Sequence, residues 1–257
     1  MRLVGFSTGA LAFADFRRGL QMLRETGAKA VELSALRAAE LDPLIESLDG
    51  LDLDQFSFKS VHAPSNVDAQ HERHVVEKLQ AVVQRGWPIV VHPDSIRDDA
   101  LWRPFGKLIC IENMDKRKPI ARTRDELCAW FDRLPEASLC LDLAHVRQID
   151  PTMTEAYLIL RDLGNRVAEV HLSEVNAASK HEPISYGATL AYQQVASMIP
   201  ENIPVILESI VRAEFIDDEI EAAHEALAIG GPRPRVRKRR SGATIWIGVT
   251  SGLTCFL

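Results

Sequence analysis

The chain has 257 residues, of which 46% are hydrophobic and 26% charged, a composition typical of soluble globular proteins. Its length fits one α/β barrel, and no run approaches the roughly 18 consecutive apolar residues that a membrane helix needs. The formal net charge is −6, but residues 1–230 carry −12, because six of the 30 basic residues and none of the 36 acidic residues follow position 230. Such an acidic body repels a phosphate backbone, so nucleic acid is not expected as the main partner.

Apolar runs rich in β-branched residues recur along the chain with helical patterns between them, which is typical of β/α units around a parallel sheet. Asp15 is a candidate N-cap of the first helix, and Gly27 a candidate stop. Strands are predicted at 2–6, 29–33, 57–62, 87–92, 108–112, 138–143, 167–172 and 204–208. Helices are predicted at 15–26, 43–48, 70–85, within 96–103, 124–134, 153–163, 188–198 and 216–228.

Strict alternation of strands and helices leaves a closed barrel or an open doubly wound sheet as the main architectures. The eight predicted strands, and the lack of a Gly-rich phosphate loop after the first of them, favour a single-domain (β/α)8 TIM barrel over residues 1–230. Residues 231–257 begin with a basic, Pro-containing run and fall outside the pattern, so we expect a disordered or non-native tail, with a functional basic arm as the alternative.

The chain begins with MRLVGFS, which has neither the basic nor the apolar region of a signal peptide, and its four cysteines form no regular framework. A cytoplasmic location is therefore expected.

Six side chains of the kinds that bind metal ions end successive predicted strands, each in its own β/α unit. In a closed parallel barrel the carboxyl ends of all strands surround one mouth. One such residue alone is more often a hydrogen-bonded or solvated loop residue, but three acids and three histidines facing one mouth would be left unsatisfied without a cation. The sequence therefore predicts a divalent metal site made by His62, His92, Glu112, Asp142, His171 and Glu208.

The order of these motifs resembles the xylose-isomerase-like barrel superfamily, which includes sugar isomerases, ketose epimerases and endonuclease IV. The resemblance spans nearly all of residues 1–230, and it implies a metal-dependent enzyme of carbohydrate chemistry with a sugar-like small molecule as its partner. It rests on SVHAP (60–64), VVHPD (90–94), CIENMD (110–115), LDLAH (141–145), EVHLSE (169–174), KHEP (180–183) and VILES (205–209).

The ketose epimerases of this superfamily hold a single metal ion, which the resemblance places on Glu112, Asp142, His171 and Glu208. The two glutamates would also transfer protons on either side of the sugar carbon, and His145 of the Asp-x-x-His motif would contact the substrate. A metal-dependent isomerase or epimerase of a sugar or sugar phosphate is the first hypothesis. A homo-oligomer is compatible with it.

Endonuclease IV binds three zinc ions through nine ligands, and eight of them have counterparts here. The ninth, an Asp two residues before the counterpart of His181, is replaced by Ser179, and the loop after His62 lacks an aromatic wedge for DNA. A zinc phosphodiester hydrolase is the alternative function, and a barrel that binds a sugar-like ligand without turnover is a third. The eight counterparts are His62, His92, Glu112, Asp142, His145, His171, His181 and Glu208.

The identity of the metal depends on which residues bind it. Two Glu, one Asp and one His make an oxygen-rich site suited to Mn²⁺, Mg²⁺ or Co²⁺, whereas recruitment of His62, His92 or His181 would shift the preference toward Zn²⁺. Trp87 and Trp102 flank the loop of His92 and could form an apolar wall against which a sugar ring packs, although packing in the hydrophobic core explains both side chains more simply. The candidate substrate-binding residues are His145, His181 and Trp87.

Strand alternation places residues two positions before each ligand inside the barrel. Cys110 and Cys140 are then small core residues. Glu169 is the exception, because a carboxylate in this interior needs a partner such as Arg2 or Lys59.

Overall fold

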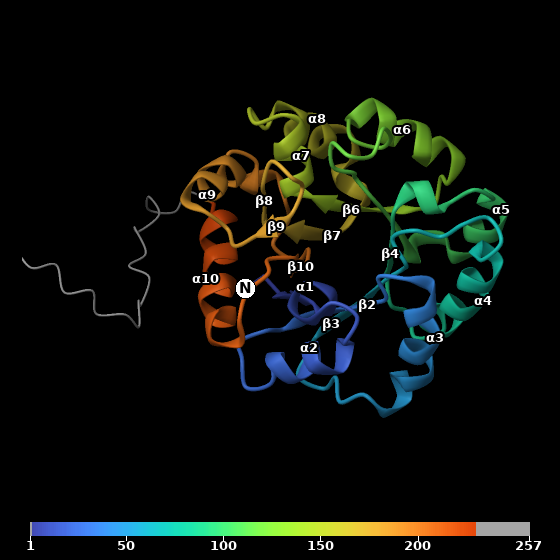
Figure 1. Ribbon diagram of the computed structural model, residues 1–257. Helices are drawn as coiled ribbons and strands as arrows, with labels where there is room; N and C mark the ends of the chain where they lie inside the picture. Colours follow the sequence, from blue (N-terminus) through green and yellow to red (C-terminus); the bar gives the residue numbers. More distant parts are fainter. Residues whose placement is uncertain (1, 230–257) are drawn as a thin grey trace, which may run out of the picture.

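The computed structural model describes residues 2–229, in which eight parallel strands close into one barrel surrounded by helices (Figure 1). Around the barrel the strands follow the order β1, β10, β7, β6, β5, β4, β3 and β2. The eighth barrel strand is β10 because a two-stranded hairpin, β8–β9, is inserted after β7. The predicted (β/α)8 barrel is confirmed. The expected tail, residues 231–257, lies outside the described residues.

The barrel strands begin and end within two residues of the predicted positions. Most of their residues are buried, because helices cover the outer face and side chains fill the interior. Long apolar runs are therefore a reliable signal for them. The strands are β1 (Val4–Ser7), β2 (Ala30–Ser34), β3 (Phe58–His62), β4 (Ile89–Val91), β5 (Ile109–Glu112), β6 (Ser138–Asp142), β7 (Val167–Leu172) and β10 (Val205–Leu207).

Every predicted helix is present, and the first begins as expected, with the Asp15 carboxylate accepting a hydrogen bond from the Arg18 N–H at 2.9 Å. The second predicted helix begins at Ala38 rather than at Pro43, because the Glu40 carboxylate accepts the backbone N–H groups that precede it. No helix within residues 2–229 has the length and apolar character that crossing a membrane needs. These helices are α2 (Phe16–Leu23), α3 (Ala38–Ser47), α4 (Glu72–Val83), α5 (Asp99–Trp102), α6 (Arg124–Arg133), α8 (Thr154–Leu163), α9 (Tyr186–Gln193) and α10 (Ile216–Ala226).

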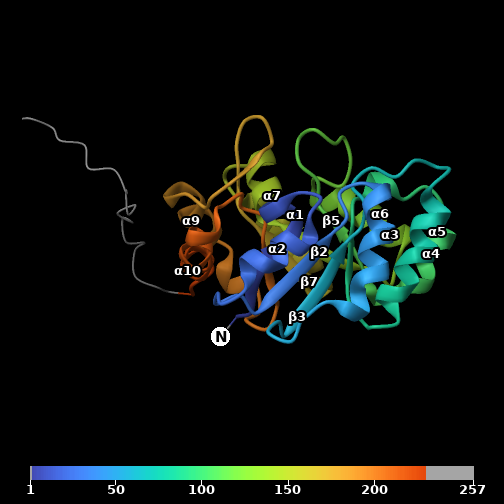
Figure 2. The same ribbon diagram turned by 60° about the horizontal axis from the view of Figure 1, so that its bottom comes forward.

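Apart from short 3-10 turns, the described residues contain three elements that were not predicted, and each follows the carboxyl end of a barrel strand. Helix α1 (Thr8–Ala12) follows β1, and helix α7 (Leu143–Ile149) follows β6. The hairpin of β8 (Glu174–Val175) and β9 (His181–Glu182) follows β7, and its gold loop stands above the barrel in Figure 2. All three therefore lie at the mouth where the candidate ligands converge.

Small side chains fill the barrel interior below the mouth. Cys110 and Cys140 pack there with Val90, as the strand alternation predicts. The Arg2 guanidinium instead donates to backbone carbonyls of residues 199 and 200, both at 2.9 Å. Neither Arg2 nor Lys59 forms an ion pair with Glu169 among the described residues, so that predicted pairing is wrong. The partner of Glu169 is His171.

Gly5 lies where β1 approaches β2 most closely. A Cβ atom at this position would stand 1.6 Å from the carbonyl oxygen of Ala30. We expect Gly5→Ala to separate the two strands and to lower the free energy of unfolding by at least the roughly 1–3 kcal/mol that overpacking costs. Urea unfolding measures this loss. Gly50→Ala is the control, because nothing lies within 4 Å of its Cβ position, and equal stability of the two variants would contradict the close approach.

Candidate metal centre

Four of the predicted ligands come together at the mouth of the barrel. Glu112 and Asp142 end β5 and β6, His171 lies in β7, and Glu208 follows the last residue of β10. The pairing of β6 with β7 sets Asp142 opposite His171. One ligand atom from each of the four lies within 4.8 Å of the others, a spacing that one ion could bridge.

Three of these four side chains present an unsatisfied atom. Asp142 Oδ2, His171 Nδ1 and Glu208 Oε2 are buried and have no hydrogen-bond partner. The nearest histidine nitrogens lie 3.4 Å from Asp142 Oδ2 and 3.5 Å from Glu208 Oε2. Burial of polar atoms without partners is costly, and a cation would satisfy all three together. The residues present therefore fit a divalent metal ion.

Local structure aims Asp142 at this point. Its Oδ1 accepts the backbone N–H of His145 at 2.7 Å and thereby caps helix α7. The side-chain amide of Asn113, which the sequence analysis did not single out, bonds both the N–H and the C=O of Asp142 at 2.8 Å. These contacts fix the residue and leave Oδ2 free for a ligand.

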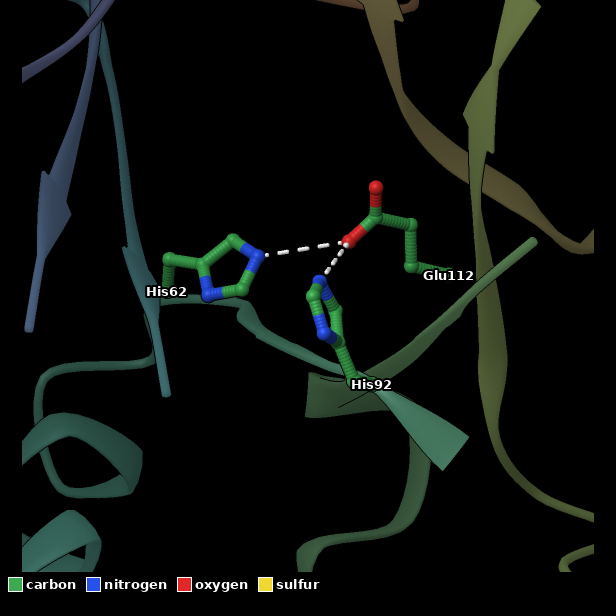
Figure 3. A group of neighbouring side chains, drawn as sticks. All are labelled: His62, His92 and Glu112. Atoms are coloured by element: carbon green, nitrogen blue, oxygen red, sulfur yellow. Dashed lines mark hydrogen bonds and ion pairs between the residues drawn. The ribbon is translucent and has the colours of Figure 1, made fainter. Parts of the chain in front are cut away.

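A second donor group adjoins the first. His62, at the end of β3, and His92, just after β4, point their Nε2 atoms at the same oxygen of Glu112, at 3.2 and 3.1 Å (Figure 3). The Nδ1 of His62 donates to the carbonyl of Ala63 at 2.6 Å, so Nε2 is the nitrogen that would bind a cation once it has given up its proton. The other Glu112 oxygen lies 3.7 Å from His171 Nδ1, so Glu112 faces both groups.

The two remaining predicted histidines line the same cluster. His145, on α7, is buried with Nδ1 at 3.4 Å from a Glu112 oxygen. His181, on the hairpin, has Nδ1 at 2.8 Å from Ser173 Oγ, and its side chain is 23% exposed, which places it toward the solvent. Ser179 bonds the side chain of Gln148 instead, at 2.9 and 3.1 Å.

The structure does not bring Trp87 to the cluster. It precedes β4, whereas His92 follows the carboxyl end of the same strand, and it packs against the hydrophobic core. Trp102 is fully buried and donates its indole N–H to Glu72 at 2.9 Å. Core packing accounts for both rings, and the role of Trp87 in substrate binding is not supported.

Negative charge is in excess at the mouth. Among the described residues, the ion-pair partners of Glu112, Asp142 and Glu208 are all histidines. Burial, with help from the other two carboxylates, raises the pKa of Asp142 to about 6. Burial lowers the pKa of His62, but Glu32 and Glu112 outweigh it and raise that pKa to about 9. Either protons on histidines or a bound cation must balance these carboxylates.

Glu32 is a functional candidate that the sequence analysis missed. It lies in β2, is fully buried, and its Oε2 stands 3.3 Å from His171 Nε2. Glu169, which was predicted to face the interior, stands 3.1 Å from the same nitrogen. Each carboxylate stands between apolar residues within a predicted strand, in AVELS and in VAEVH. A charged residue at such a position is the signal that could have identified Glu32.

No family model and no curated protein matches the chain. Solved structures match over most of it. A xylose isomerase domain protein from Alicyclobacillus acidocaldarius has 11% identity and a TM-score of 0.58, over 87% of this chain and 97% of its own. The chain therefore shares the barrel fold of this protein.

Two further structures share this fold. A probable 3-DHS dehydratase from Bacillus anthracis has 12% identity and a TM-score of 0.55, over 87% of this chain and 98% of its own. Endonuclease IV from Thermus thermophilus has 16% identity and a TM-score of 0.52, over 88% of this chain and 99% of its own. Since one fold carries several chemistries, function must be argued from the side chains at the mouth.

Proposed function

We propose that the protein is a metal-dependent isomerase or epimerase of a sugar or sugar phosphate, within the xylose-isomerase-like superfamily. The observation that carries the proposal is the group Glu112, Asp142, His171 and Glu208, whose buried donor atoms converge on one point. Three carboxylates and one imidazole favour Mn²⁺, Mg²⁺ or Co²⁺. The resemblance of the ordered motifs to ketose epimerases supports the same assignment.

The bound ion would supply Lewis-acid polarisation of neighbouring substrate oxygens. Glu208 is the member of the group that is not fully buried, with 15% of its side chain exposed, so it can face a substrate entering from the mouth. Glu208 would accept a proton from the carbon beside the carbonyl, and a proton would return from the other side through Glu112, supplied by His62, whose Nε2 lies 3.2 Å from it. His145 and His181, whose rings lie 5.5 Å apart, would hold substrate hydroxyls.

A zinc-dependent phosphodiester hydrolase is the second candidate, and the group His62, His92 and Glu112 favours it. A carboxylate that faces two donor groups is suited to two neighbouring ions. Two observations count against this function. The charge of −12 on residues 1–230 opposes a nucleic-acid substrate, and Ser179 bonds Gln148 rather than joining the cluster.

Exchange of carbon-bound hydrogen with D₂O separates the two candidates. With Mn²⁺ or Co²⁺ added, we expect deuterium to enter at least one ketose or ketose phosphate at the carbon beside the carbonyl, observed by NMR. Protein treated with a chelator is the control. If no ketose exchanged hydrogen, while a model phosphodiester was cleaved with Zn²⁺, the isomerase assignment would be replaced by the hydrolase.

A further inference from the structure

Two buried carboxylates meet one imidazole nitrogen inside the barrel. Glu169 Oε1 and Glu32 Oε2 lie 3.1 and 3.3 Å from His171 Nε2, and all three side chains are fully buried. Strand β2 is not paired with β7, so Glu32 reaches His171 across the interior. The proposed mechanism uses neither carboxylate.

Two buried carboxylates beside one histidine would be costly for the free energy of folding if they served stability alone. The same interior level is otherwise filled by Val90, Cys110 and Cys140, which leave no charge buried. A buried ion pair is usually no more stabilising than apolar residues of similar volume. Glu169 Oε2 and Glu32 Oε2 both lack a hydrogen-bond partner, so Glu169 Oε1 is the oxygen that bonds His171 Nε2, and Glu32 acts on this nitrogen through its charge. The carboxylates therefore call for a function beyond stability.

Both nitrogens of His171 face carboxylates, but those around Nε2 lie closer than those around Nδ1. Nε2 faces only acceptors, whereas Nδ1 has no hydrogen-bond partner and faces Glu112 and Glu208 at 3.7 and 3.6 Å. A neutral imidazole carries one N–H, and a carboxylate can only accept it. The proton then lies on Nε2, and the Nδ1 lone pair is directed to the mouth.

We propose that Glu169 and Glu32 are positioning residues that hold the His171 proton on Nε2 and keep Nδ1 available to a divalent cation. The inference rests on the proposed metal site. Carboxylates that accept the second N–H of a ligating histidine fix its ring orientation and strengthen it as a ligand. Glu169 would contribute more than Glu32, because its contact is shorter and comes from the same strand as His171.

Zn²⁺ affinity, measured by competition with a chelator, tests the proposal. Glu169→Gln keeps the side-chain shape, but its amide can donate to Nε2 and push the proton to Nδ1. We expect affinity to fall about 10–100-fold, and less for Glu32→Gln. Cys110→Ala is the matched control, because it alters the same interior level and should leave the affinity unchanged. Wild-type affinity in Glu169→Gln, or an equal loss in the control, would overturn the proposal.

¹⁵N NMR of the histidine rings gives a readout that needs no variant. In the Zn²⁺-loaded protein His171 should be protonated on Nε2 only, with a slowly exchanging proton; a proton on Nδ1 would overturn the proposal even if Glu169→Gln fails to fold. Absence of binding of Mn²⁺, Co²⁺ and Zn²⁺ alike by the wild type would instead remove the proposed function. In that case a hydrogen-bonded Nε2–H of His171 in the metal-free protein would still support the role of the two carboxylates in placing the proton. A His171 without a hydrogen-bonded Nε2–H would overturn this role as well.

Discussion

Replacement of Glu208 by Gln should nearly abolish turnover while a metal ion stays bound. The amide keeps the shape and one coordinating oxygen of the carboxylate, but it cannot accept a proton near neutral pH. Loss of a positioned general base costs about 10²–10⁴-fold in rate. Steady-state kinetics, D₂O exchange and metal content on the same sample measure the effect.

Asp142→Asn is the control for this prediction. Asp142 caps α7 with one oxygen and offers the other to the site, so it would act as a ligand and not as a base. Its variant should lose metal, and excess ion should restore part of the activity. If Glu208→Gln behaved in the same way, with activity recovered by added metal, Glu208 would be a ligand alone and the hydrolase would be favoured.

Glu112→Gln should weaken metal binding more than loss of any other single ligand. One Glu112 oxygen faces His62 and His92, and the other faces His145 and His171. The amide has one oxygen and loses the negative charge, so both donor groups are affected. We expect metal affinity and turnover to fall by at least about 100-fold, because loss of a residue that only supports a metal ligand already costs up to that much.

Calorimetric titration with Mn²⁺ and Zn²⁺ measures this loss. Glu126→Gln is the matched control, because Glu126 pairs with Arg122 at the surface and belongs to α6, the helix after β5. The Glu126→Gln variant should bind both ions as tightly as the wild type. The surface ion pair that it loses contributes about 0–1 kcal/mol to stability and does not involve the ligands at the mouth. Undiminished binding by Glu112→Gln would exclude Glu112 as a shared ligand.

The architecture could be predicted because the barrel strands are buried on both faces and therefore read as apolar runs. The short elements at the mouth could not. Helix α7 has seven residues and the strands of the hairpin two each, too few for any periodic pattern. Their positions are set by contacts between distant residues, such as the bonds of Asn113 to Asp142.

The candidate ligands could be predicted because a strand end is a defined place in a parallel barrel. Contacts across the interior could not be predicted in the same way. Glu32 and Glu169 come from strands that are not paired, and only the closed barrel brings both to His171. Trp87 was misplaced because nearness in sequence to His92 says nothing about which end of β4 a ring occupies.

Metal content and the positions of bound ions are the most direct test of the proposed metal site. The protein would be equilibrated with Mn²⁺, Co²⁺ or Zn²⁺, its metal measured by mass spectrometry, and the ions located by anomalous scattering from crystals. We predict an ion bound by Glu112, Asp142, His171 and Glu208, and a further ion at His62 and His92 would favour the hydrolase. Protein that binds no ion among these four residues under any of the three conditions would contradict the account.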